Sequence, residues 1–91
     1  MQIFTLNTLV STLNSALVNL GGSAKAAYEV VPEWRGAMVQ VNSITLVVYQ
    51  DEQDHSWTVD VIDAEGCPDV YGFADVYEAI GFVIATYLRL V

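Results

Sequence analysis

The segment from residue 37 to residue 63 constrains the fold most, because its apolar side chains recur at every second position. Near its end, Trp57, Val59 and Val61 alternate with polar residues. Period two is typical of a β-strand with one buried and one solvated face. We predict three antiparallel strands over residues 37–41, 44–50 and 55–63. The turns between them are predicted at Asn42-Ser43 and at residues 51–54, where polar turn-forming residues gather.

The same periodicity assigns side chains to the two faces of the predicted sheet. In the second strand Ile44, Leu46 and Val48 face the core. The opposite face then carries Thr45, Val47, Tyr49, Thr58, Asp60 and Ile62. This outer face is partly apolar, so we expect it to be covered by another part of the chain or used for binding.

Helices are predicted both before and after these strands. Leucines at helical spacing mark residues 6–20, with Thr5 or Asn7 as the N-cap and Gly21-Gly22 at the end. A second, short helix is predicted over residues 23–31, ended by Pro32.

The last helix is predicted over residues 73–90, after a loop at 64–72 in which 69–71 could add a short edge strand. Its expected buried stripe is Phe73, Val76, Tyr77, Ile80, Val83, Ile84, Tyr87 and Leu88, with Phe82 and Leu90 outside it. The expected fold is α+β: a three-stranded antiparallel meander with the N-terminal and C-terminal helices packed on one face.

Composition indicates one small domain with a surplus of apolar side chains. The 91 residues are 54% hydrophobic and 15% charged, which favours burial and argues against disorder. The single cysteine, Cys67, allows no intramolecular disulfide and fits a cytoplasmic location. The longest uncharged apolar run, at residues 79–88, is too short to span a membrane.

The acidic residues are concentrated in one part of the chain. Nine of the eleven Asp and Glu residues lie between residues 51 and 78, a stretch without Lys or Arg, and the net charge is −8. Such a charge disfavours nucleic acid and anionic membranes and favours basic partners. The candidate partner-binding residues are Asp51, Glu52, Asp54, Asp60, Asp63, Glu65, Asp69, Asp75 and Glu78, with Tyr49, Tyr71 and Trp34 as aromatic anchors.

No pattern of catalytic or metal-binding residues stands out. His55 and Cys67 are the only nucleophile-and-base candidates, and nothing in the sequence brings them together. The EF-hand spacing, zinc spacing and glycine-rich phosphate loop are missing. A calcium site of another kind at Asp51, Glu52 and Asp54 remains an alternative. We therefore expect no catalytic residue, cofactor or metal.

In size, acidity and compactness the chain resembles small inhibitor proteins encoded by phages and mobile elements, including DNA mimics and anti-CRISPR proteins. This resemblance implies a non-catalytic protein that occupies a basic groove of a nucleic-acid-binding complex. One alternative is an immunity- or antitoxin-like partner of a basic toxin. Another is a structural subunit, such as a homodimer, that associates through surplus apolar surface, and an enzyme is the third.

Overall fold

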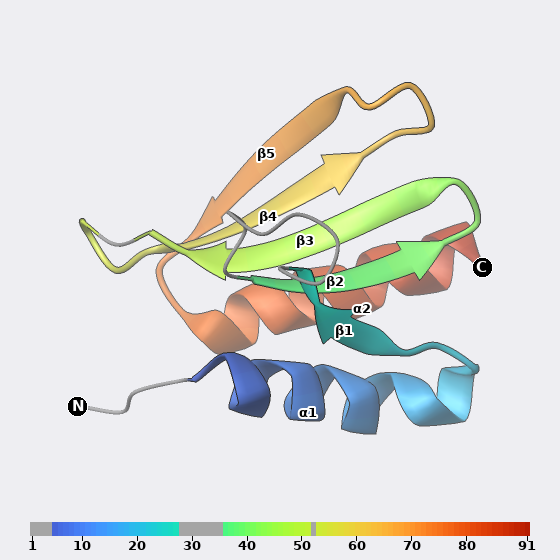
Figure 1. Ribbon diagram of the computed structural model, residues 1–91, viewed down its shortest axis with the longest axis horizontal. Helices are drawn as coiled ribbons and strands as arrows, with labels where there is room; N and C mark the ends of the chain where they lie inside the picture. The colour runs from blue at the N-terminus through green and yellow to red at the C-terminus, as the bar shows by residue number, and fades with distance from the viewer. Residues whose placement is uncertain (1–4, 28–35, 52) are drawn as a thin grey trace.

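The computed structural model describes residues 5–27, 36–51 and 53–91, and it confirms the α+β class. The elements in chain order are α1 (Leu6–Leu17), the 3-10 turn η1 (Val18–Leu20), β1 (Ala24–Ala26), β2 (Gly36–Val41), β3 (Ile44–Gln50), β4 (Trp57–Ile62), β5 (Pro68–Phe73) and α2 (Val76–Leu90). The strands form one antiparallel sheet in the order β1-β2-β3-β4-β5 (Figure 1). The three predicted central strands are β2, β3 and β4, and the sheet has one further strand at each edge.

The strand β1 replaces part of the predicted second helix. Residues 24–26 pair with β2, with Lys25 opposite Met38, so the helix prediction over 23–31 is wrong for these three residues. The high helix propensity of alanine is overridden by pairing with the sheet. Residues 28–31, and the expected connector with Trp34 and Arg35, lie outside the described residues.

The strand β5 takes up most of the predicted loop. It spans residues 68–73 and places Phe73 opposite Trp57, so Phe73 belongs to a strand and not to the last helix. Pro68 and Gly72 indicated a loop, but an edge strand tolerates both. The helix α2 begins at Val76 because the Asp75 side chain accepts a hydrogen bond from the Tyr77 N–H at 2.6 Å and acts as the N-cap.

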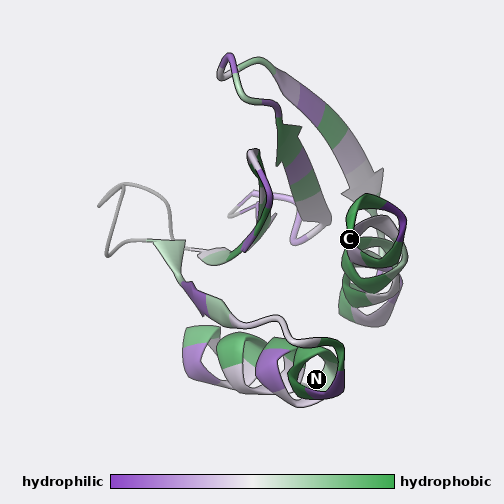
Figure 2. Cartoon of the chain, turned by 90° about the vertical axis from the view of Figure 1, so that its right-hand side faces the viewer, coloured by the Kyte–Doolittle hydropathy of each residue, from purple (hydrophilic) through white to green (hydrophobic). Residues whose placement is uncertain are grey.

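Both helices cover the same face of the sheet, as predicted. Figure 2 shows α1 and α2 on one side of the curved strands. The main core joins the helices to the central strands through Leu9, Leu13, Leu17, Leu46, Val48, Trp57, Val59, Ile80, Val83 and Tyr87, all buried. The central-strand assignments are therefore confirmed.

The predicted helix stripes are wrong at several positions. Tyr77 and Leu88 are exposed at 57% and 55%, because α2 contacts the sheet through a face centred on Val83. Phe82, expected outside the stripe, is half-buried with its ring centroid 5.3 Å from that of Phe73. Leu90 is also half-buried against the core. The periodicity gives only the approximate width of the apolar stripe on a helix. Which residues at the margins of the stripe are buried depends on where the helix contacts the sheet.

A second apolar cluster lies on the outer face of the sheet. Met38 and Val47 are buried there with Ala27, and Tyr49 and Ile62 pack against them. The outer face is therefore buried around Val47. This agrees with the first of the two expectations for this face, that it is covered, and not with its use for binding at this point.

One side chain of α1 satisfies the outward backbone groups of Ala24 at the β1 edge. The Asn14 carboxamide donates to the Ala24 carbonyl at 3.1 Å and accepts from the Ala24 N–H at 2.7 Å. These two bonds have the pattern of those from a neighbouring strand, so α1 closes this edge of the sheet at Ala24.

The predicted helix over residues 6–20 has its last three residues in the 3-10 turn η1, and two glycines with different roles follow it. Gly21 adopts the left-handed conformation with φ of 79°, as the sequence predicted. Gly22 allows close packing, since a Cβ there would lie 2.7 Å from the Tyr87 hydroxyl oxygen. The Tyr87 hydroxyl donates to the Leu20 carbonyl at 3.5 Å, which links the two helices.

We predict that Asn14→Ala lowers the free energy of unfolding by about 1–3 kcal/mol, because it leaves two backbone groups of a buried strand residue unpaired. Urea denaturation followed by circular dichroism measures this. Asn7→Ala, at an exposed position of the same helix, is the matched control and should change stability by less than about 0.5 kcal/mol. Equal effects of the two substitutions would contradict the role assigned to Asn14.

Candidate functional site

The acidic residues do not converge on one face but form two groups at opposite ends of the sheet. The first acidic group is Asp51, Asp54, Asp75 and Glu78, on the β3–β4 turn and at the start of α2. The second acidic group is Asp63, Glu65 and Asp69, on the β4–β5 turn and the first half of β5. Figure 1 shows these turns at opposite ends of the molecule. The strand β4 lies between the groups, and the five intervals between its six residues, at about 3.3 Å each, set them roughly 17 Å apart.

Three more of the expected site residues lie apart from both groups. Asp60 in β4 and Tyr49 in β3 lie on the outer face, and Tyr71 is in β5 on the face of α2. Glu52 and Trp34 lie outside the described residues.

In the first acidic group, the carboxylates shape the local backbone. Asp51 accepts hydrogen bonds from the N–H groups of Gln53 and Asp54, at 2.8 and 3.2 Å. The Asp54 side chain accepts from the Ser56 N–H at 2.9 Å, and hydrogen bonding to Ser56 lowers the pKa of the Asp54 carboxyl. Such bonds are typical of Asx turns. The β3–β4 turn therefore depends on the carboxylate oxygens of Asp51 and Asp54 as acceptors of its backbone N–H groups.

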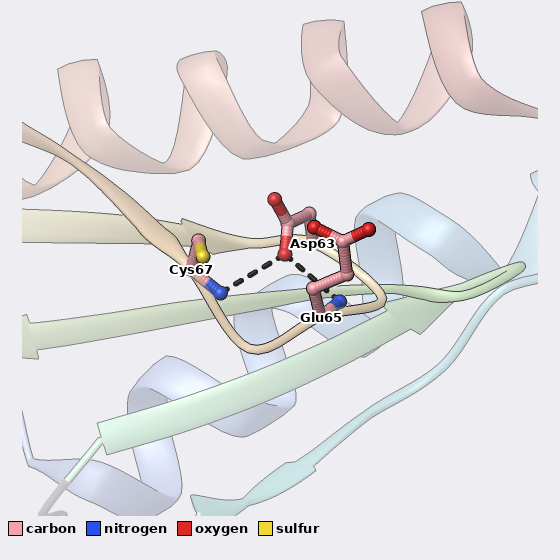
Figure 3. A group of neighbouring side chains, drawn as sticks. All are labelled: Asp63, Glu65 and Cys67. Atoms are coloured by element: carbon pink, nitrogen blue, oxygen red, sulfur yellow. Dashed lines mark hydrogen bonds between the residues drawn. The ribbon is translucent and has the colours of Figure 1, made fainter.

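In the second acidic group, Asp63 organises the β4–β5 turn. One of its carboxylate oxygens accepts from the N–H groups of both Glu65 and Cys67, each at 2.9 Å (Figure 3). Gly66 supplies the positive φ of 84° that the turn requires. Cys67 is exposed on this turn.

The side chains of Asp63, Glu65 and Cys67 are also close enough to be considered as metal ligands. Their donor atoms lie within 4.8 Å of one another, and all three residues are exposed (Figure 3). The turn hydrogen bonds of Asp63 account for this proximity without an ion. Three exposed donors on a surface turn, one of which already accepts two N–H groups, provide little preorganisation for a metal.

Among the expected site residues that the structure describes, Tyr49 and Asp60 form a side-chain pair. The Tyr49 hydroxyl donates to the two Asp60 oxygens at 3.2 and 3.4 Å. Partial burial, followed by the negative charge of Asp60, raises the pKa of the Tyr49 hydroxyl. Burial also raises the pKa of the Asp60 carboxyl, and the Tyr49 hydrogen bond partly offsets this. Asp60 is therefore partly buried on the sheet, unlike the other acidic candidates described.

The residues examined for catalysis are not brought together. His55 lies in the β3–β4 turn and Cys67 in the β4–β5 turn, at opposite ends of β4, so they form no dyad. A shallow hollow of about 720 Å³ between α1 and β1 is lined by uncharged residues and Lys25. A smaller one of about 260 Å³ is lined by residues including Thr86 and Arg89. Of the acidic residues that the structure describes, none lines either hollow.

No helix within the described parts of the chain is long and apolar enough to cross a membrane. Comparisons with protein-family models, with curated proteins and with solved structures found no match.

We predict that Asp60→Asn raises the thermal midpoint at pH 7, because the folded state then buries no carboxylate at this position. The pKa of Asp60 is raised on folding, so its ionisation lowers stability as the pH rises above the unfolded value of about 3.9. The gain from Asp60→Asn should therefore be largest at neutral pH and should vanish below about pH 4. Thermal melts from pH 3 to pH 8 test this, with Asp69→Asn, an exposed position, as the control. A difference independent of pH would contradict it.

Proposed function

We propose that the protein is a non-catalytic interaction protein that binds a basic surface of a nucleic-acid-binding complex and excludes the nucleic acid. The observation that carries this proposal is that exposed carboxylates are held in fixed positions without compensating cations. Asp51, Asp54, Asp63 and Asp75 are each held by backbone hydrogen bonds. Among the described residues, no carboxylate is paired with Lys25 or Arg89.

Within the described residues, the lack of counter-charges paired with these carboxylates matters for binding. An ordinary soluble surface mixes both signs of charge, which weakens the field outside the protein. Here one sign dominates the end turns and the start of α2. Carboxylates fixed by the backbone also lose little further entropy on binding. Both properties favour rapid association with a basic partner.

The separation of the two acidic groups suits a duplex-binding surface. B-DNA carries about one charge per 1.7 Å of its axis and completes a turn in roughly 34 Å. Two groups roughly 17 Å apart would span about half a turn. A groove lined with Lys and Arg for a duplex could therefore meet both groups at once. We include a cytoplasmic location in the proposal, which the lone cysteine favours.

The structural-subunit alternative loses part of its motivation. Phe82 and Leu90, whose apolar side chains were expected to be free, are half-buried against the core. The outer-face residues Met38 and Val47 are buried as well. A basic toxin remains a possible partner of the same chemistry, and the identity of the captured protein separates it from a nucleic-acid-handling complex.

We predict that the immobilised protein retains basic proteins from a fraction that has been eluted from a DNA-cellulose column. Retention at about 0.05 M salt should be lost by about 0.5 M, because screening shortens the range of the attraction. Added duplex DNA should release the captured protein. Neutralising Glu65, Asp69 and Glu78 as Gln, Asn and Gln should weaken retention and make it less sensitive to salt, because fewer fixed charges remain to attract the basic partner.

These three carboxylates are chosen because none accepts a hydrogen bond within the described residues, so the fold should be retained. The matched control is the double variant Ser11→Ala and Ser15→Ala on the exposed, uncharged face of α1, which should bind as the parent does. Retention that is indifferent to salt and to the triple substitution would overturn the proposal.

A further inference from the structure

The two edges of the sheet differ in whether their backbone groups are paired. At the β1 edge, Asn14 satisfies the N–H and C=O of Ala24. At the opposite edge, β5 has β4 on one side and, among the described residues, no strand or side chain bonded to its other side. An unpaired strand edge is a template for a further strand.

The register identifies which backbone groups of β5 are free. The Asp63 N–H donates to the Cys67 carbonyl at 3.2 Å where the β4–β5 pairing begins. Because bonded and non-bonded pairs alternate in an antiparallel ladder, the residues of β5 that bond to β4 are Asp69, Tyr71 and Phe73. The N–H and C=O groups of Val70 and Gly72 therefore point away from the sheet.

Pro68 agrees with this assignment, since it has no N–H and falls at a position that does not bond to β4. It also limits the free edge at its beginning. The available template is therefore the short stretch from the Pro68 carbonyl to Gly72, which is enough for one short strand.

The side chains along this edge are apolar in the middle and acidic at both ends. Val70 is 63% exposed on the outer face. Tyr71 is 42% exposed on the other face, with its ring centroid 4.7 Å from that of Phe82. The second acidic group lies at the beginning of β5, and Asp75 and Glu78 follow its end.

This pattern selects the occupant of the edge. A second copy pairing antiparallel through β5 would bring the first acidic group of each copy against the second acidic group of the other, with a net charge of −8 on each. Like charges placed opposite each other destabilise such pairing. An extended segment with apolar residues in its middle and Lys or Arg at its ends is complementary in both respects.

We propose that the β5 edge binds an extended, basic-ended segment of a partner protein as a sixth strand of the sheet. This inference rests on the proposed function, because it specifies how a basic partner is held. Backbone hydrogen bonds to Val70 and Gly72 would supply the pairing, and the carboxylates at the two ends would select the charge and register of the segment.

Hydrogen exchange of the free protein tests the edge without a variant. We expect the amides of Val70 and Gly72 to exchange rapidly, and those of Tyr71 and Phe73 to be protected by their bonds to β4. Protection of Val70 and Gly72 together with a dimeric mass in light scattering would assign the edge to a second copy and overturn the inference.

The binding test uses the peptide Lys-Lys-Val-Thr-Val-Thr-Val-Lys-Lys, followed by amide chemical shifts and titration. We expect the largest shifts at Val70 and Gly72. The same peptide with both Thr replaced by Pro keeps the charge but cannot form a regular ladder, and should bind at least about tenfold more weakly.

The matched protein variants are Val70→Pro, which removes an outward N–H, and Val70→Ala, which keeps it. Since the Val70 N–H does not bond to β4, the hairpin should survive both changes, and circular dichroism checks this. Val70→Pro should weaken binding at least about tenfold and Val70→Ala less than about threefold.

The outcomes separate this inference from the proposed function. If both peptides bind equally and salt-dependently, or if Val70→Pro binds as the parent does, the edge inference fails while binding to basic surfaces stands. If neither peptide binds, the edge inference fails as stated. If basic proteins are also not retained in the column experiment, the proposed function fails as well.

Discussion

Leu13 from α1 and Val83 from α2 meet Val48 and Val59 of the central strands in one fully buried layer. Burial of apolar surface contributes about 25 cal/mol per Å², and no other interaction here removes as much of it from water. Because side chains in a strand alternate, burying one face of β3 and β4 also fixes which residues face outward. Asp60 is on the outer face for this reason. The turns that contain Asp51 and Asp63 lie at opposite ends of β4.

Several of the acidic residues have a structural role that their number alone conceals. Asp51, Asp54 and Asp63 accept backbone N–H groups in turns, and Asp75 caps α2. Asp is favoured at such positions because its short carboxylate reaches the backbone of the next residues. The same carboxylates therefore carry the negative charge and hold the backbone of the turns. The charge is thus fixed in position by the hydrogen bonds that shape the loops.

The β5 edge lies between the two acidic groups and joins their possible roles. A carboxylate alone sets a long-range attraction but little geometry, whereas an unpaired strand edge sets direction and register. In the proposed binding mode, the carboxylates attract a basic segment and the backbone groups of Val70 and Gly72 align it. At the other edge, Asn14 already occupies the outward backbone groups of Ala24.

The sequence by itself determined the central strands, a helix that begins near Thr5, a chain reversal at Gly21 after it and the sharing of one sheet face by both helices. These follow from local rules: alternation, helical spacing, capping and the freedom of glycine. Only the tertiary structure decided that Ala24–Ala26 is a strand, that β5 includes Pro68 and Gly72, and that Tyr77 and Leu88 are exposed. Each of these depends on a neighbour distant in sequence, such as Asn14, β4 or Phe73. The sequence also did not predict that the acidic stretch divides into two groups. The order of charged residues along the chain does not indicate at which end of the sheet each turn lies.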